Sequence, residues 1–212
     1  MKKITIDSLY DWQNGRGIWL LLAVVCLALL MIAHSIFQHW LFMKPCEQCV
    51  YIRFGFFVIV LGCLIAMIQP TNNILKAIAY VFSFYGMIQG IIWSYTLNKI
   101  HIAAHGDNPF GVQGCSTEPH YPFGLRLENW SPDWFMPTGD CGFDNPFVPD
   151  GTQLGALQQW FVDFYADGWY LWPASHFGNM AVITGIAFFI MLVVLSVFCV
   201  SWLLSMKKQI SK

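Results

Sequence analysis

Four cysteines in the polar segments of the chain are the residues best suited to covalent chemistry: Cys46, Cys49, Cys115 and Cys141. The first two form a C-x-x-C unit. A disulfide between cysteines three residues apart closes so small a loop that it adds little stability, so redox chemistry is its better use. Peptide N–H groups at the start of a following helix favour the thiolate of Cys49. Lys44 and Arg53 add positive charge, and Glu47 opposes them.

Cys115 and Cys141 are separated by 26 positions in a polar segment. A bond between them would stabilise the fold by about 3 to 4 kcal/mol in the chain-entropy picture. Alone, such a pair is typical of a structural disulfide. Beside a C-x-x-C, it can instead relay electrons by successive thiol–disulfide exchange. Zinc is the competing use of four cysteines, but the wide second pair fits the usual zinc spacing poorly. We therefore predict no metal ligands.

The elements that position these cysteines follow from composition. The 212 residues are 57% hydrophobic and 11% charged, against about 25% charged in soluble domains. This excludes a disordered chain or a nucleic-acid binder. Four long stretches without Asp, Glu, Lys or Arg predict membrane-spanning helices near residues 17–43, 54–73, 77–97 and 180–206. The predicted fold is an all-α, four-transmembrane-helix bundle in one membrane domain, residues 1–212. Gly86 and Gly90 indicate a close helix contact.

Charge asymmetry predicts the orientation. The side with both termini and the turn near Lys76 carries seven basic and two acidic residues, and the other side carries four basic and ten acidic ones. Positive charge marks the cytoplasmic face, so we expect both termini inside. Loops near 38–49 and 97–178 then face outward, where disulfides persist. The three remaining cysteines, Cys26, Cys63 and Cys199, lie in spans and pack as small apolar side chains.

The longer loop is rich in aromatic residues. Apolar residues from Leu154 to Tyr165 recur at helical spacing, so this stretch either lies in the lipid headgroup region or forms a small loop core. Trp169, Tyr170 and Trp172 are typical of an aromatic belt at the membrane interface.

Several motifs together resemble the DsbB family of bacterial inner-membrane disulfide-generating proteins. They are Gly15-Arg-Gly17, Phe37-Gln-His39, Lys44-Pro-Cys-Glu-Gln-Cys-Val-Tyr-Ile-Arg53 and the spaced Cys115 and Cys141. Nearly forty residues separate Cys141 from the last span, more than is usual in that family. This extension is most similar to the DsbI branch, whose partner is the thioredoxin-fold oxidase DsbL.

The resemblance implies a mechanism at the periplasmic face. A reduced thioredoxin-fold thiol oxidase, DsbA-like or DsbL, attacks a Cys115–Cys141 disulfide at Cys115. Cys141 then attacks Cys46 and displaces Cys49 as a thiolate, which passes electrons to a membrane quinone, either ubiquinone or menaquinone. Arg53 lies one helical turn after Cys49 and would stabilise the charge.

His39 and Gln38 are further candidate quinone contacts; His39 equally suits a packing or interface contact, and Gln38 better suits a hydrogen bond between helices. Two other classes of protein compete with this reading. One is a membrane metal or haem protein that uses the outer Cys and His residues. The other is a non-enzymatic membrane subunit that its disulfides merely stabilise.

Overall fold

The computed structural model describes residues 6–106 and 115–210. Residues 107–114, which belong to the predicted outer loop, and parts of both basic termini lie outside this description. In the described ranges, four helices are long and apolar enough to cross a membrane. They are α2 (Gly17–Met31) continued by η1 (Ile32–Trp40), α3 (Glu47–Ile68), α4 (Asn73–Ala104) and α8 (Met180–Ile210). The predicted four-helix membrane bundle is confirmed.

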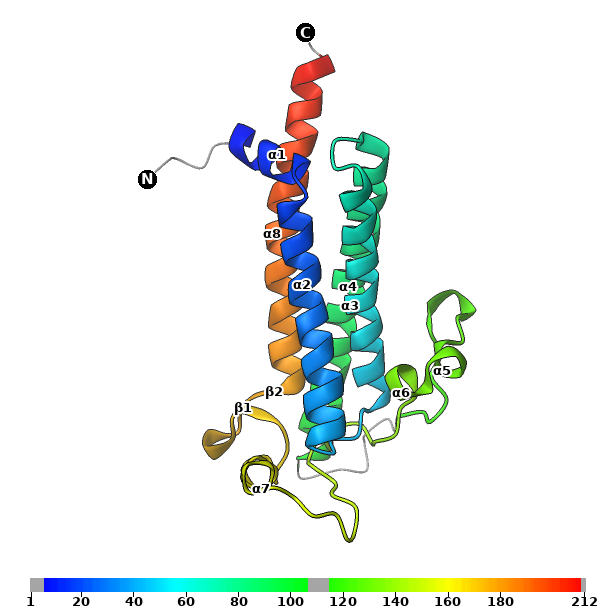
Figure 1. The fold of residues 1–212 in the computed structure, drawn as a ribbon, viewed down its shortest axis with the longest axis vertical. Helices are drawn as coiled ribbons and strands as arrows, with labels where there is room; N and C mark the ends of the chain where they lie inside the picture. Colours follow the sequence, from blue (N-terminus) through cyan, green and yellow to red (C-terminus); the bar gives the residue numbers. More distant parts are fainter. Residues whose placement is uncertain (1–5, 107–114, 211–212) are drawn as a thin grey trace.

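Figure 1 shows the four helices side by side, with α1 (Ile6–Asn14) and the carboxyl end of α8 at one end of the bundle. The loop elements lie at the other end: η3 (Pro122–Gly124), α5 (Leu127–Trp130), α6 (Pro132–Phe135), α7 (Ala156–Phe164), β1 (Tyr170–Trp172), η4 (Pro173–Ser175) and β2 (Phe177–Asn179). Strands β1 and β2 pair antiparallel in a short hairpin, which the all-α prediction did not include. Both disulfides lie at this end, which we call the disulfide end.

α3 is the most buried of the four long helices. Its closeness to α4 depends on glycine, because a Cβ on Gly86 would lie 2.6 Å from the Gly55 carbonyl oxygen. A Cβ on Gly90 would meet the Phe188 ring of α8 at 2.5 Å. The predicted close contact at Gly86 and Gly90 is therefore confirmed, and it draws α3, α4 and α8 together.

The buried Gln13 side chain hydrogen-bonds α1 to the end of the bundle opposite the disulfides. Its Nε2 donates to Ser201 Oγ at 2.9 Å, and its Oε1 accepts from the Tyr80 hydroxyl at 2.6 Å. The Trp19 indole Nε1 donates to the Gln13 carbonyl oxygen at 3.0 Å. Buried polar groups at this end are thus paired with one another.

α7 has two apolar faces. Phe161 and Tyr165 pack beside Leu41, Met43 and Trp169, in line with a loop core. Leu157, Trp160 and Phe164 are exposed on another face. The predicted aromatic helix is thus present, and part of it belongs to a core at the disulfide end.

Candidate active site

The C-x-x-C unit forms the start of α3. Cys46 is the N-cap residue with an extended backbone, and its Sγ accepts a hydrogen bond from the Cys49 N–H at 3.2 Å. The two residues are joined by a disulfide with Cα atoms 5.0 Å apart. Cys46 is buried and Cys49 is half-buried. The first turn of the helix therefore places a free N–H group on the Cys46 sulfur, and the disulfide lies at the positive end of the helix dipole.

The helix α3 begins at Glu47, whereas the predicted span began at residue 54. Hydropathy placed Glu47 and Arg53 outside the span because both are charged. In the structure, both side chains have polar partners. Glu47 Oε1 accepts from the Tyr51 hydroxyl at 2.9 Å, and Arg53 is bound by three oxygens. Paired charges can lie within a helix at the edge of a membrane.

Cys115 and Cys141 are joined by the second disulfide, with Cα atoms 5.6 Å apart. The chain leading to Cys141 is held against the C-x-x-C unit, because the Thr138 and Gly139 N–H groups donate to the Pro45 carbonyl oxygen at 2.9 and 3.0 Å. The approach requires glycine: a Cβ on Gly139 would lie 2.5 Å from the Lys44 carbonyl oxygen.

The segment that follows Cys115 is also hydrogen-bonded to the residues of the C-x-x-C unit and the first turns of α3. Glu47 Oε2, between the two cysteines of the C-x-x-C, accepts a hydrogen bond from the Ser116 N–H at 2.8 Å. The Tyr51 hydroxyl accepts from the His120 N–H at 2.6 Å. Both chain segments that carry the second disulfide are therefore tied to the first turns of α3.

The sulfurs of the two pairs share one buried environment. Cys46 and Cys141 are 3% and 6% exposed and belong to the same core, against which Cys49 and Cys115 pack. A cavity of about 20 Å³ is lined by Cys46, Cys49 and the residues Asp140 and Gly142 on either side of Cys141. This arrangement brings together all four of the predicted redox cysteines.

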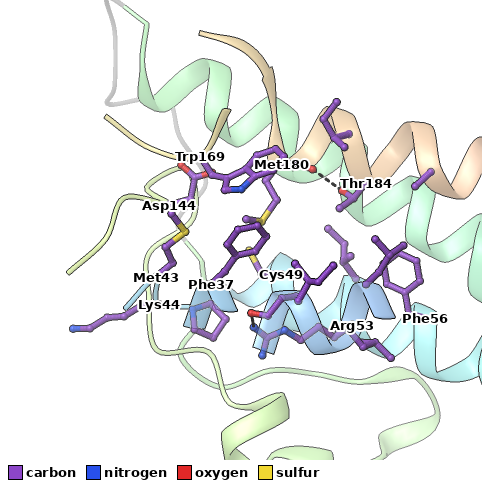
Figure 2. Close-up of a pocket in the computed structure, with 18 residues that line it drawn as sticks. Phe37, Met43, Lys44, Cys49, Arg53, Phe56, Asp144, Trp169, Met180 and Thr184 are labelled. Carbon is purple, nitrogen blue, oxygen red and sulfur yellow. Dashed lines mark hydrogen bonds between the residues drawn. The ribbon is translucent and has the colours of Figure 1, made fainter. Parts of the chain in front are cut away.

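A larger cavity of about 230 Å³, which is also lined by Cys49, lies between η1, α3 and α8 (Figure 2). Most of its wall is apolar, including Leu30, Phe37, Ile52, Phe56 and Ile183. Cys49 and Arg53 both line it, as expected for residues one helical turn apart.

Arg53 is 6% exposed, and its guanidinium is held by three oxygens. Nη1 donates to Gln38 Oε1 at 2.6 Å and to the Trp134 carbonyl oxygen at 3.3 Å. Nη2 donates to the Ala33 carbonyl oxygen at 3.3 Å. The charge is thus fixed at the cavity wall by η1 and α6.

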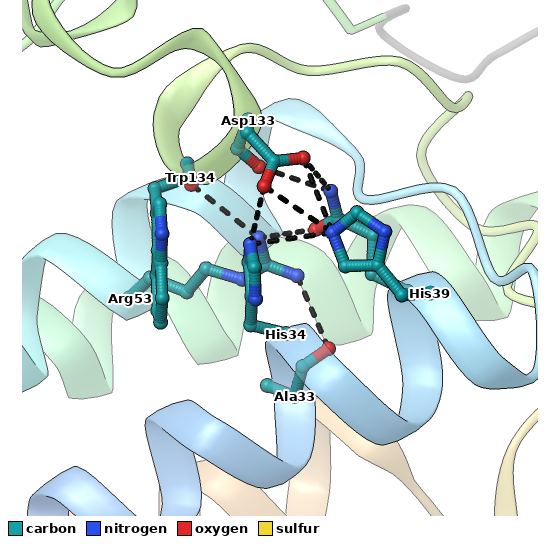
Figure 3. A network of polar contacts seen from close by, with 7 residues as sticks. Ala33, His34, His39, Arg53, Asp133 and Trp134 are labelled. Carbon is teal, nitrogen blue, oxygen red and sulfur yellow. Dashed lines mark hydrogen bonds and ion pairs between the residues drawn. The ribbon is translucent and has the colours of Figure 1, made fainter.

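Gln38 and His39 are not among the residues that line the cavity. Besides accepting from Arg53, Gln38 donates through Nε2 to the Asp133 carbonyl oxygen at 2.9 Å. The His39 ring lies against His34 and Asp133 (Figure 3). Burial opposes ionisation of Asp133, but hydrogen bonds and charge from His34 and His39 outweigh it and lower the pKa of Asp133.

Two residues of the cavity wall come from the long loop and were not among the predicted site residues. Asp144 is half-buried, and burial raises its pKa against backbone hydrogen bonds from Trp169 and from its own amide. Trp169 is 8% exposed. Within the part of the chain that the structure describes, its indole Nε1–H is buried without a hydrogen-bond partner.

The belt interpretation is therefore wrong for Trp169 and Tyr170, and for Trp172 it stays a prediction. Trp172 is 66% exposed, as a belt residue is, whereas Trp169 and Tyr170 are buried. Aromatic enrichment was the available signal, but it does not distinguish a belt from a cavity wall.

Four apolar helices with two linked disulfides at one end define the class of this protein: a multi-pass membrane protein arranged for thiol–disulfide exchange. Residues 15–199 match the family model described as "Disulfide bond formation protein DsbB".

The chain is also 51% identical to the Salmonella typhimurium "Protein-disulfide oxidoreductase DsbI", over 96% of this chain and 92% of that protein. It is 53% identical to the DsbI of Escherichia coli O1:K1, over 94% and 92% of the two chains. A Campylobacter fetus relative named DsbI is 51% identical over 98% and 97%. The chain belongs to the DsbB family, and its similarity to the DsbI branch extends through the loop extension.

Proposed function

We propose that this protein is a protein-disulfide oxidoreductase of the bacterial inner membrane that reoxidises a periplasmic thiol oxidase and delivers the electrons to a membrane quinone. The observation that carries the proposal is the chain of neighbouring groups from the Cys115–Cys141 disulfide, through Cys46–Cys49, to a cavity lined by Cys49 and Arg53. The family and the names of the relatives support the same activity.

The relay consists of exchange steps in which one S–S bond breaks as another forms. A thiolate of the reduced partner attacks the Cys115 sulfur, and Cys141 leaves as a thiolate. Cys141 then attacks Cys46, and Cys49 leaves with the electron pair of the broken bond. Because hydrogen bonds at Pro45 and Glu47 join the segments that carry the two disulfides, these segments are positioned beside each other before reaction.

Cys49 suits the part of the leaving group. It lies in the first turn of α3, where the helix dipole and free N–H groups stabilise a thiolate. The buried Arg53 guanidinium one turn later adds a fixed positive charge at the same cavity. A lower thiol pKa also makes a sulfur leave faster.

The residues around the cavity fit a quinone. An apolar cavity of about 150 Å³ suffices to bind benzene, so the 230 Å³ seen here admits a quinone ring. The unpaired Trp169 Nε1–H is a donor for a carbonyl oxygen, and Arg53 supplies a charged donor from α3. Trp169 and Arg53 would hold a quinone here, and the quinone would supply the two-electron acceptor that lets the Cys46–Cys49 disulfide re-form, with two protons going to the quinol.

Gln38 serves in this proposal by holding the Arg53 guanidinium. Contact between His39 and the quinone stays a prediction. The partner we propose is a thioredoxin-fold oxidase, DsbA-like or DsbL, and the quinone is ubiquinone or menaquinone. The disulfide end faces the periplasm, as the charge asymmetry predicts.

Single cysteine variants test the order of the relay. Cys49→Ser and Cys46→Ser are expected to abolish quinone reduction with any thiol donor. Cys115→Ser is expected to block oxidation of the protein partner while dithiothreitol still drives quinone reduction through Cys46–Cys49. Cys199→Ser, a free cysteine within α8, is the matched control and retains both activities. The relay is refuted if Cys49→Ser reduces quinone normally.

A further inference from the structure

A second cluster of side chains lies beside the redox site but outside the sulfur relay. His34, His39 and Asp133 place one donor atom each within 4.8 Å of one another. Asp133 Oδ2 lies 2.8 Å from His34 Nε2 and 3.3 Å from His39 Nε2, and the two Nε2 atoms are 3.4 Å apart. Figure 3 shows both rings turned toward the carboxylate.

The helix that carries the two histidines has a rare form that aligns them. His34 and His39 are five residues apart, so an ordinary α-helix would place them about 140° apart around its axis. They lie instead in the π-helix η1, where bonds such as Leu41 N–H to the Ile36 carbonyl oxygen span five residues. Such helices are rare and are frequently found at functional sites.

Hydrogen bonding alone does not satisfy this cluster well. If both Nε2 atoms carry protons for Asp133, two N–H groups face each other across 3.4 Å. If His39 instead accepts from His34, its Nε2 presents a lone pair to the carboxylate. A cation between the three groups resolves this conflict, because each then offers it a lone pair.

We propose that His34, His39 and Asp133 bind a divalent transition-metal ion of the Zn²⁺ type. Ligand bonds of about 2.0 to 2.1 Å in tetrahedral geometry place the ligand atoms about 3.3 to 3.4 Å apart. The separations of 3.4 Å between the two histidines and 3.3 Å between His39 and Asp133 match this value. The shorter separation of 2.8 Å between His34 Nε2 and Asp133 Oδ2 would have to widen slightly to admit the ion.

The donor set and surroundings suit such an ion. Two imidazoles and one carboxylate leave the remaining tetrahedral position to solvent. The His39 and Asp133 side chains are 51% and 54% exposed, so the ion and a water molecule have access. The nearby Arg53 charge opposes a cation. Gln38 lies between Arg53 and Asp133, accepting from the first and donating to the second, and Asp133 supplies the compensating negative charge.

The ion would join η1 to α6. His34 also stacks on Trp134, with ring centroids 3.8 Å apart, and the Trp134 carbonyl oxygen holds Arg53. A metal at this position would therefore fix the segment that positions Arg53. The sequence predicted no metal ligands in the leading interpretation, the outer histidines were metal ligands only in the competing metal or haem interpretation, and Asp133 was not a candidate ligand.

Calorimetric titration of Zn²⁺ into the full-length protein tests the proposal. The protein is purified in detergent with a tag that lacks histidine, stripped with a chelator and kept oxidised so that the four disulfide sulfurs cannot act as ligands. No quinone or thiol partner is present, so the result is independent of the relay. We expect one equivalent of Zn²⁺ to bind and to raise the melting temperature.

His39→Asn and Asp133→Asn keep much of the local shape and are each expected to weaken Zn²⁺ binding at least tenfold and to remove the rise in melting temperature. His120→Ala and Asp150→Ala, exposed residues of the same types elsewhere in the loop, are the controls and bind Zn²⁺ like the parent protein. The proposal is overturned if the parent binds no stoichiometric Zn²⁺, or if both site variants bind it as tightly as the parent.

Discussion

Replacing Trp169 with Phe tests whether the unpaired indole N–H serves the quinone. The variant keeps an aromatic ring in the cavity wall and removes only the donor and part of the ring. A hydrogen bond from this donor to a neutral carbonyl oxygen is worth about 0.5 to 1.5 kcal/mol. Since 1.4 kcal/mol is a factor of ten, the KM for quinone is expected to rise by about 2-fold to 12-fold.

Trp19→Phe is the matched control. Trp19 is 1% exposed, and its Nε1–H donates to the Gln13 carbonyl oxygen at the end of the bundle away from the disulfides. Both variants lose the same ring atoms, but only Trp19→Phe breaks a hydrogen bond present in this structure. Leaving a buried acceptor unpaired costs about 1 to 3 kcal/mol, so Trp19→Phe is expected to be the less stable of the two.

The assay is steady-state reduction of a water-soluble quinone by the dithiothreitol-reduced protein, with thermal unfolding measured in parallel. The expected pattern is a raised KM with little loss of stability for Trp169→Phe, and an unchanged KM with clear loss of stability for Trp19→Phe. Equal quinone KM values in Trp169→Phe and the parent protein would refute the assignment of Trp169 as a quinone donor.

Three further variants test neighbouring parts of the site. Arg53→Lys keeps the charge but cannot reach three oxygens at once, so quinone kcat/KM is expected to fall about tenfold or more, and an unchanged value contradicts the role of the guanidinium. Gly139→Ala forces the segment before Cys141 away from Lys44, and a displacement near 1 Å can slow a positioned reaction about 100-fold. Oxidation of the protein partner should slow accordingly while quinone reduction driven by dithiothreitol stays normal, and equal effects on both would count against the relay. Asp144→Asn tests a pH effect. Burial raises the pKa of Asp144 in the folded protein above 3.8. Protonated Asp144 therefore contributes its full stability below pH 3.8, and this contribution is lost as the pH rises through the folded-state pKa. The variant should therefore melt higher than the parent at pH 7 and similarly near pH 4, and a constant difference would show that Asp144 is not the cause.

The sequence predicted the membrane bundle because uncharged stretches of this length have few alternatives. It placed the ends of the spans by charge, and α3 extends beyond the uncharged stretch to begin at Glu47, beside Cys49 as expected for the C-x-x-C unit. Glu47 and Arg53 enter the helix because Tyr51, Ser116 and Gln38 pair with them, and no local pattern reveals such partners. Hydropathy therefore gives the number and type of spans more reliably than their ends.

In the site, too, local features could be predicted from the sequence and long-range contacts could not. The C-x-x-C spacing and the four-residue step from Cys49 to Arg53 are local features, so the sequence could place these two residues on one face of a helix. The pairing of Gly139 with Pro45 and the arrival of Trp169 at the cavity depend on how the long loop folds back. The π-helix was also beyond prediction, because nothing in the residues from Ile32 to Trp40 distinguishes it from a continued α-helix.

The contacts of the loop extension explain what it does in the structure. Phe147 N–H donates to the Phe42 carbonyl oxygen, and Gln158 Nε2 donates to the Trp40 carbonyl oxygen, so the loop is fastened to the segment between η1 and α3 at two points. Between the cysteine pair and α8 it then supplies Asp144 and Trp169 to the cavity wall. Trp169 stands near the end of the extension, so its position in the cavity wall depends on how the whole loop folds back. In the proposed relay, the extension therefore serves the cavity that receives the electrons as well as the disulfide that delivers them.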